Sequence, residues 1–405
     1  MAVGTPPPID FPPVPGFRVA ATACGLKTNG RPDLLLIHMH PAASVAGVFT
    51  RNQMAAAPVQ ICRQRLAGGR AEALLVNAGN ANAGTGPQGM HNALTVSEAV
   101  AQKLGVSNDH VFVSSTGVIG QPLNVAKIRV AIPHLVTNLR ADAWADAAVA
   151  ITTTDTFPKA RHRRCILDGR PVVLAGMAKG AGMIHPDMAT LLSYVFTDAA
   201  IAPSAWQQLL ARAVQASFNC ITVDGDTSTN DTLMGFASGV AGNPLLTDPD
   251  SPSATPLANA LNDLCLELAH LVVRDGEGAT KFITITVAGA ACVEDAQKIG
   301  KVVAHSQLVK TACFGNDPNW GRILAAIGRA GVPIDVNGVD IFLGGVQIVQ
   351  QGGLAPSYTE AQGAHVMAAP EITIHIDLHA GQATATTWTC DLSHDYVTIN
   401  ADYRT

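Results

Sequence analysis

The chain has 405 residues, of which 48% are hydrophobic and only 14% are charged. This composition supplies the interior of one large body or of two domains and leaves little charged surface. With 26 Lys and Arg against 31 Asp and Glu, the net charge of -5 offers no general attraction for phosphate backbones, so a nucleic-acid partner is not expected.

The eight cysteines contain no Cys-x-x-Cys pair, which argues against zinc ribbons and disulfide scaffolds. We interpret them as buried thiols in a reducing compartment. The first residues lack the basic start and apolar core of a secretory signal, and no apolar run approaches membrane-spanning length. We therefore expect a cytoplasmic protein without a membrane partner.

In chain order, residues 1–15 form a proline-rich arm, which is expected to lie extended on the surface or to be mobile. Strands and helices are then expected to alternate, as in a layered α/β protein. The expected strands are 17–24, 34–38, 73–77, 110–114, 172–175, 191–197, 232–237 and 282–287, and the expected helices are 91–104, 143–151, 204–217, 257–273 and 295–311. Residues 243–256 contain four prolines and indicate a surface loop. This pattern alone does not distinguish a sandwich from a doubly wound sheet.

The segment that ends in Met188-Ala-Thr190, just before an apolar run, is the most informative about function. A threonine hydroxyl is a poor nucleophile until a base removes its proton, and an N-terminal threonine carries its own amine for that task. The Thr190 hydroxyl would attack the carbonyl of Ala189, a small residue that leaves it accessible. In isolation, however, Ala-Thr before an apolar stretch is typical of a strand start.

The residues Thr116 and Gly117 follow a strand-like run and offer a backbone turn. Its N–H groups, with the Thr116 hydroxyl, would stabilise a developing oxyanion. The spacing itself favours an ordinary strand-to-helix turn with Thr116 as a helix cap.

Three further residues allow both a structural and a functional interpretation. Lys179 is either a surface lysine or the partner of a substrate carboxylate, and its charge would also favour the unprotonated Thr190 amine. Thr153 is either a cap or a pocket residue. Glu277, between two glycines, is either a solvated loop residue or the anion for a cationic substrate group.

Other motifs are weaker. Asn77–Gly84 lacks the ending of a phosphate-binding loop, so a structural turn beside the site is expected. Asp224–Asp231 does not match calcium-loop spacing, and we predict no metal site. Trp320 is expected to anchor a helix start.

Six motifs, in this order along the chain, resemble the ornithine acetyltransferase family of arginine biosynthesis. They are Ser115-Thr-Gly-Val-Ile-Gly120, Thr153-Thr-Asp-Thr156, Lys179-Gly-Ala-Gly-Met with Met188-Ala-Thr190, Asp275-Gly-Glu-Gly-Ala-Thr-Lys281, Gly315-Asn-Asp-Pro-Asn-Trp-Gly-Arg322 and Asn400-Ala-Asp-Tyr-Arg-Thr405. The resemblance runs from about residue 16 to the last residue.

The resemblance implies a layered α-β-β-α sandwich of the self-processing ornithine acetyltransferase type. It implies cleavage between Ala189 and Thr190, which gives fragments 16–189 (after the arm) and 190–405, two copies of each per assembly. It makes Thr116 and Gly117 the oxyanion pair. It also places six residues in the substrate pocket, namely Thr153, Lys179, Thr190, Glu277, Asn400 and Thr405.

The activity implied is acetyl transfer from N-acetylornithine to glutamate through acetyl-Thr190, without a cofactor. Some family members also accept acetyl-CoA as donor, and these motifs do not separate the two types. Two alternatives remain open from the residues: a self-processing hydrolase or aminopeptidase, and an amino-acid-binding protein without turnover.

Overall fold

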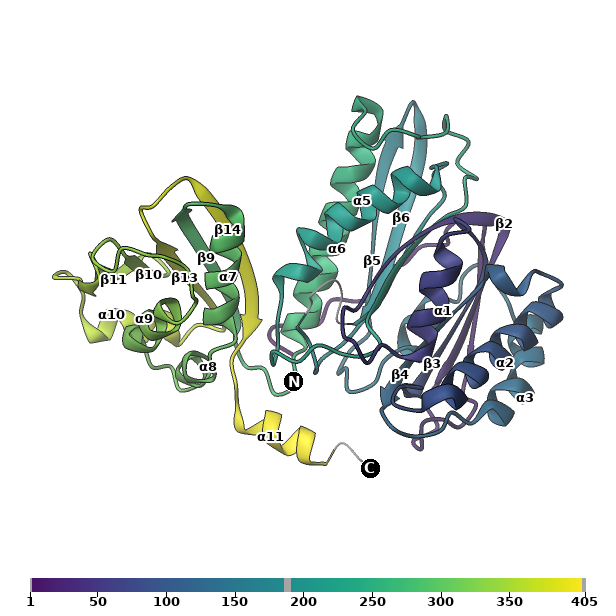
Figure 1. Ribbon diagram of the computed structural model, residues 1–405, viewed down its shortest axis with the longest axis horizontal. Helices are drawn as coiled ribbons and strands as arrows, with labels where there is room; N and C mark the ends of the chain where they lie inside the picture. The colour runs from purple at the N-terminus through teal and green to yellow at the C-terminus, as the bar shows by residue number, and fades with distance from the viewer. Residues whose placement is uncertain (1, 186–190, 403–405) are drawn as a thin grey trace.

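The computed structural model describes residues 2–185 and 191–402, and within them the chain forms two units joined side by side (Figure 1). The first unit is built on an eight-stranded sheet of order β4-β3-β2-β8-β7-β6-β5, in which β1 also pairs with β2. Its strands are β1 (Phe17–Thr22), β2 (Leu34–Phe49), β3 (Arg70–Asn80), β4 (Val111–Val118), β5 (Lys159–Leu167), β6 (Arg170–Lys179), β7 (Leu192–Thr197) and β8 (Thr232–Ala237).

The long strand β2 lets this sheet fold over on itself. Its first part pairs with β1 and β3, its last part pairs with β8, and the register with β3 shifts between His38 and Ala43. The inner faces of the two halves then meet, because Phe112 of β4 packs edge-on against Phe236 of β8 with ring centroids 6.2 Å apart. A bulge that bends a strand in this way is a common device for turning a sheet.

Helices cover the outer faces of the folded sheet (Figure 1). The helices α1 (Ala57–Leu66), α2 (Gly86–Leu104) and α3 (Val125–Thr137) pack on the half with β1 to β4, α5 (Pro203–Gln215) and α6 (Thr255–Arg274) pack on the other half, and α4 (Trp144–Ala150) contacts strands of both. All six residues of β7 are buried, since this strand is covered on both faces. The expected α-β-β-α layering is therefore confirmed, and the doubly wound alternative is wrong.

The proline-rich arm is extended and held against the first unit. The Val3 amide donates to the Arg274 carbonyl at 2.8 Å, and Arg161 donates to the Pro8 carbonyl at 2.8 Å. The Phe11 ring stacks on Trp144 at 4.4 Å. The arm therefore packs against the first unit through several of its described residues.

The second unit is a six-stranded sheet of order β12-β11-β10-β13-β9-β14 with its own hydrophobic core. Its strands are β9 (Phe282–Ala290), β10 (Asp340–Leu343), β11 (Val346–Gln350), β12 (Gly353–Leu354), β13 (Glu371–Asp377) and β14 (Ala383–Cys390), and its helices are α7 (Val293–Ala304), α8 (Gln307–Phe314), α9 (Trp320–Gly328) and α10 (Glu360–Met367). The single helix expected at 295–311 is wrong, because α7 ends at Ala304 and Ser306 caps the start of α8 through its side chain.

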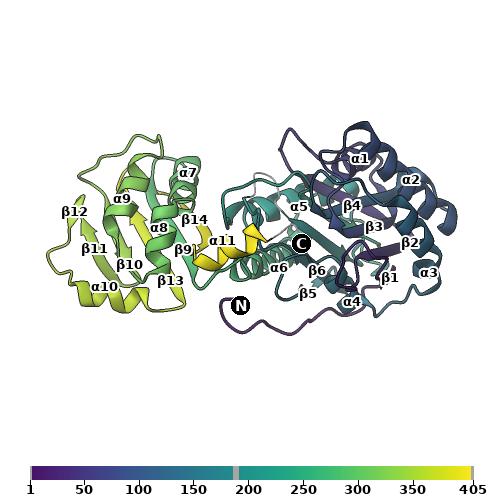
Figure 2. The same ribbon diagram turned by 90° about the horizontal axis from the view of Figure 1, so that it is seen from below.

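The last described helix, α11 (His394–Ala401), leaves the second unit and returns to the first (Figure 2). Short 3-10 helices lie at Asn108–His110, Phe218–Cys220 and Pro252–Ala254, and the last of these interrupts the surface loop expected at 243–256. Strands before residue 185 and after residue 191 share one sheet, since β7 pairs with β6. The two segments are therefore interleaved in a single body.

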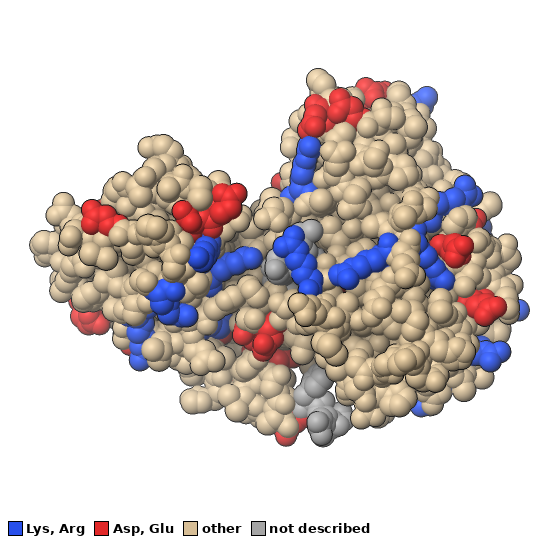
Figure 3. Space-filling view, in the orientation of Figure 1, with Lys and Arg blue, Asp and Glu red and all other residues tan. Residues whose placement is uncertain are grey.

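Charged side chains are sparse on the face seen in Figure 3, where Lys and Arg gather near the junction of the two units. None of the helices in the described part of the chain is long and apolar enough to cross a membrane. All eight cysteines are free, but Cys292 is exposed and three others are half-buried, so describing all of them as buried thiols was wrong.

Candidate active site

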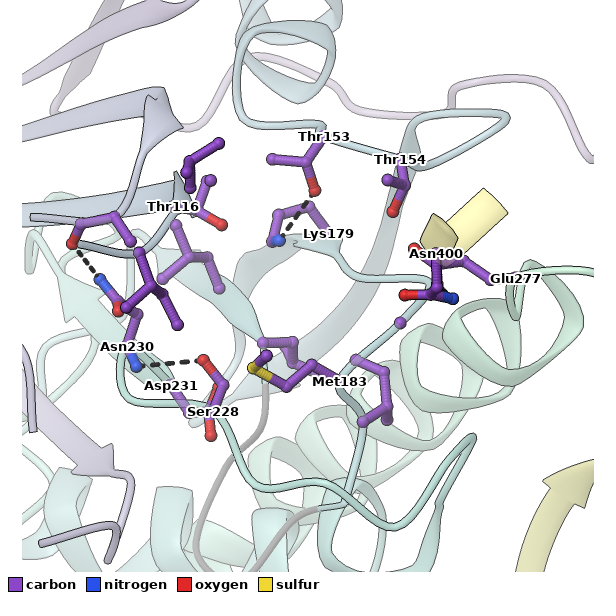
Figure 4. A pocket seen from close by; sticks show the side chains of 18 residues that line it. Thr116, Thr153, Thr154, Lys179, Met183, Ser228, Asn230, Asp231, Glu277 and Asn400 are labelled. Atoms are coloured by element: carbon purple, nitrogen blue, oxygen red, sulfur yellow. Dashed lines mark hydrogen bonds between the residues drawn. The ribbon is translucent and has the colours of Figure 1, made fainter. Parts of the chain in front are cut away.

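A cavity of about 310 Å³ lies where both halves of the sheet, the turn after α6 and helix α11 converge. Figure 4 shows Thr116 on one side of it, Glu277 with Asn400 on the other, and Lys179 with Thr153 between them. Six predicted site residues line this cavity: Thr116, Gly117, Thr153, Lys179, Glu277 and Asn400. Ala189, Thr190 and Thr405 lie outside the described residues, but Leu191, the residue after Thr190, lines the same cavity.

Lys179 ends β6 and turns its ammonium group toward the cavity. Its Nζ donates to Thr153 Oγ1 at 3.1 Å, which leaves further N–H donors of the ammonium group for a ligand. Burial lowers the pKa of Lys179, while the nearby carboxyl groups of Asp155 and Asp231 oppose that shift. An anionic substrate group would therefore meet a half-buried ammonium group that the two carboxyl groups help to keep charged.

A buried ion-pair network lies behind Thr153 and Lys179. Lys159 is fully buried, and its Nζ donates to Asp155 Oδ1 and to Asp275 Oδ2, both at 2.6 Å. Asp155 in turn accepts the backbone N–H of Thr153 at 2.9 Å and that of Gly180 at 2.7 Å. Although burial by itself raises the pKa of Asp155, Lys159 holds it well below its usual range. This network fixes the loop that carries Thr153 and the end of β6, where Lys179 lies.

Replacing Lys159 by methionine is expected to lower the free energy of unfolding by about 3 to 5 kcal/mol, because Asp155 and Asp275 would lose their shared cation inside the protein. Urea denaturation of the variant measures this loss. Lys103→Met, at an exposed position of α2, is the matched control and should change stability by less than about 0.5 kcal/mol. A loss of similar size in both variants would contradict the role of the network.

Glu277 follows α6 in a turn that binds the loop after β6. Its backbone N–H donates to the Ala181 carbonyl at 2.8 Å, and the side chain passes so close to Gly182 that a Cβ there would lie 2.3 Å from Glu277 Oε2. Asn400 Nδ2 donates to Glu277 Oε2 at 2.8 Å. Glu277 is only 7% exposed, so the solvated-loop interpretation is wrong. The second glycine of Lys179-Gly-Ala-Gly is required for this close approach.

Thr116 and Gly117 lie in the distorted end of β4. The strand continues to Val118, so the expected turn at these residues is wrong, and so is the cap, since α3 begins only at Val125. The pairing with β3 is irregular at Gly79 and Asn80, and Gly117 has φ +128°. Only glycine adopts this backbone readily, and the distortion exposes Thr116 and Gly117 to the cavity.

Sequence reasoning missed four polar cavity residues: Thr154, Ser228, Asn230 and Asp231. Three of them belong to the segment Asp224–Asp231, which is rich in oxygen ligands but does not match calcium-loop spacing. In the structure, Asp224 accepts the backbone N–H groups of Met183 and Ile184 at 2.6 and 2.9 Å, and so holds the segment before residue 186. The missed signal was a run of polar residues directly before the strand expected at 232–237.

The remaining motifs have structural positions. Strand β3 continues to Asn80, so the turn expected to begin at Asn77 is wrong for its first four residues. The segment after Asn80 does lie beside the cavity, where Ala81 lines it and Asn230 Nδ2 donates to the Ala81 carbonyl at 2.6 Å. Trp320 is the first residue of α9, as predicted.

Comparisons with known proteins indicate the family of this chain. The model of the ArgJ family matches residues 18–405. The chain is 50% identical over 406 residues to the arginine biosynthesis bifunctional protein ArgJ of Pseudomonas syringae pv. tomato, with all of both chains covered. It is 52% identical over 394 residues to the ArgJ protein of Methylococcus capsulatus, covering 97% of this chain and 96% of that one.

A crystal structure of the ArgJ protein of Bacillus halodurans is 42% identical, with a TM-score of 0.49, covering 51% of this chain and 97% of that chain. Since the family model spans nearly the whole sequence and relatives about half identical match it from end to end, this chain belongs to the ArgJ family.

Proposed function

We propose that this protein transfers an acetyl group from N-acetylornithine to glutamate in arginine biosynthesis, through an acetyl ester on Thr190. The observation that carries the proposal is the meeting of six residues, from Thr116 to Asn400, around one cavity that Leu191 also lines. Residues so far apart in sequence gather when a substrate must be held on several sides. The names of the curated relatives, which are bifunctional enzymes of arginine biosynthesis, support the same pathway.

Self-cleavage comes first in the proposed mechanism. The Thr190 hydroxyl attacks the Ala189 carbonyl, the acyl group moves from nitrogen to oxygen, and water releases it. This leaves fragments 1–189 and 190–405 and a free amine on Thr190. The amine then removes the proton of its own hydroxyl when Thr190 attacks N-acetylornithine, and ornithine departs. Glutamate takes the acetyl group from the ester.

Charge stabilisation and recognition are assigned to the cavity residues. Thr116 and Gly117 stabilise the oxyanion. The α-carboxylate common to both substrates is held by Lys179, with Asn400 and Thr405, while Thr153 orients Lys179. Glu277 binds the side-chain ammonium of ornithine, which needs a fixed anion.

Both acyl steps proceed without a cofactor in this proposal, and acetyl-CoA is proposed as a second donor, since the curated relatives are named bifunctional. We further propose an assembly of two copies of each fragment, and the cytoplasm as its location. The interleaving of β6 and β7 supports the joint purification of the fragments.

Incubation with N-acetylornithine, with and without glutamate, tests the activity. Transfer releases ornithine in quantity only when glutamate is present, whereas a hydrolase or aminopeptidase releases it in both cases. A binding protein without turnover releases none. Acetyl-CoA with glutamate, in a parallel tube, tests the second donor. Initial rates should give parallel double-reciprocal plots, because acetyl-Thr190 separates the two half-reactions.

Replacing Glu277 by glutamine is expected to raise the KM for N-acetylornithine about ten- to a hundredfold and to affect glutamate less. The change keeps the shape but removes a charge whose hydrogen bond is worth about 1.5 to 3 kcal/mol. Steady-state kinetics of the fully cleaved variant measure both substrates. Glu360→Gln, at an exposed position of α10 in the second unit, is the matched control. Equal losses for the two substrates would rule out the selective role.

A further inference from the structure

The carboxyl group of Asp231 is an unexplained feature of the cavity. Asp231 is 1% exposed, and its Oδ2 has no hydrogen-bond donor among the residues that the structure describes. It lines the same cavity as Thr116 and Lys179. A buried carboxyl oxygen without a donor costs free energy, so a site that keeps one has a reason to do so.

The backbone places Asp231 next to the predicted cleavage point. The amide of Thr232 donates to the Leu191 carbonyl at 2.9 Å, and the Asp231 carbonyl accepts the Thr50 amide at 3.0 Å. Asp231 therefore lies at the start of β8, beside the first described residue after Thr190. Its own position is fixed before any ligand arrives.

The charged groups around the cavity define what this carboxyl group meets. Lys179 of β6 and Glu277 after α6 are the other ionisable side chains that line the described part of the cavity. On the far side of Thr50, Arg63 of α1 donates to the Thr50 carbonyl. Burial raises the pKa of Asp231 well above its usual range, and Lys179 opposes that shift without bonding to Oδ2. A positively charged donor would offset the cost of burying the carboxylate and would also supply the missing hydrogen bond.

We propose that Asp231 is the hydrogen-bond partner of the α-amino group that cleavage before Thr190 creates, and that it holds this amine in place as the base for the Thr190 hydroxyl. The assignment rests on the proposed self-cleavage. Before cleavage, the nitrogen of Thr190 belongs to a peptide bond, has one N–H and cannot act as a base. After cleavage, it has the donors that Oδ2 lacks.

The proton balance of the cycle requires no proton transfer to or from Asp231. The amine nitrogen takes the hydroxyl proton as the Thr190 oxygen bonds to the acetyl carbon. The resulting ammonium gives that proton to the amine of the departing ornithine as the carbon–nitrogen bond breaks. Asp231 accepts an N–H hydrogen bond in both states, whereas Lys179 disfavours the ammonium form. The two opposed charges keep the pKa of the amine near neutral pH, where a general base is most effective.

The test titrates the amine directly. Cyanate carbamylates only unprotonated amines, so the rate of carbamylation of the fragment 190–405 against pH, followed by mass spectrometry, gives the pKa of the Thr190 amine. The α-amine of the other fragment is a reference in the same tube. Burial and the charge of Lys179 both lower the pKa of the Thr190 amine, whereas Asp231 raises it. We expect the wild-type pKa within or above the ordinary range of about 7.7 to 8.0.

Asp231→Asn should lower the pKa of the Thr190 amine by about one unit or more, since a nearby opposite charge typically shifts a pKa by about 1 to 3 units. The acid limb of the kcat profile should move to lower pH by the same amount. Asp231→Glu keeps the charge and should retain most of the wild-type value. Asp198→Asn is the matched control, because Asp198 is also buried but accepts the Val173 amide at the far end of β7.

Three outcomes would overturn the assignment. One is an unchanged amine pKa in a cleaved Asp231→Asn variant. Another is a wild-type amine pKa far below the ordinary range. This measurement does not depend on whether any variant folds. An uncut wild-type chain overturns the self-cleavage as well, and the fragment mass identifies that case.

Discussion

Thr190→Ala is expected to remain a single uncut chain and to show no acetyl transfer. The alanine has no hydroxyl to attack the Ala189 carbonyl, and without cleavage no amine is formed to act as base. Denaturing electrophoresis should show one full-length band for the variant, whereas the wild type should give two bands of similar size, from residues 1–189 and 190–405. The same preparations serve for the transfer assay.

The control for this variant is Thr197→Ala, at the other end of β7, where the threonine is buried and accepts the Ala199 amide. It should be cleaved and active. Efficient cleavage of Thr190→Ala would rule out Thr190 as the attacking group. Native purification adds a second check, because strands from both sides of the cut share one sheet and the fragments should elute together.

Thr116→Ala should slow both self-cleavage and acetyl transfer by about 100- to 1000-fold, the usual effect of removing one oxyanion donor. Both reactions pass through a tetrahedral intermediate with a negatively charged oxygen, so one donor serves both. A time course of band conversion measures the first rate, and steady-state kinetics of the cleaved protein measure the second. Unchanged rates for both reactions would show that Thr116 is not the donor.

Thr116 is the more informative member of the pair. A Cβ on Gly117 would lie 2.4 Å from the Gly79 carbonyl carbon, and its φ of +128° is strained for any side chain. A Gly117 variant would therefore disturb β3 and β4 as well as the oxyanion site. Thr137→Ala, at an exposed position of α3, is the matched control and should retain both rates.

The sequence by itself determined the elements whose pattern is local. The expected strands at 191–197 and 232–237 correspond to β7 and β8, and the expected helix at 257–273 corresponds to α6. These segments have long apolar runs or strong helical periodicity, and such patterns predict the type of element and its buried face in most folds. The motifs likewise identified six residues that the structure brings to one cavity, although their chemical roles stay predictions.

Local pattern failed where burial depends on partners. The helices α1, α3, α10 and α11 and the strand β5 were missed. So were the strands of the second unit after β9, which are short and bury only part of their surface. Arg163 and Arg164 make β5 resemble an exposed loop, yet the strand pairs along its length with β6, and Arg163 pairs with Glu267 of α6. Tertiary pairing outweighs the weak strand propensity of such residues.

Only the tertiary structure decided how the halves of the sheet meet and which polar residues share the cavity. The fold at β2 depends on a register shift, and β8 joins β2 across nearly two hundred residues of chain, a pairing that no local pattern records. The same pairing puts Asp231 beside Leu191 and leaves its Oδ2 without a donor in the described residues. A sequence shows that a carboxyl group exists, but its burial and its missing partner depend on long-range contacts, because these alone remove water from it.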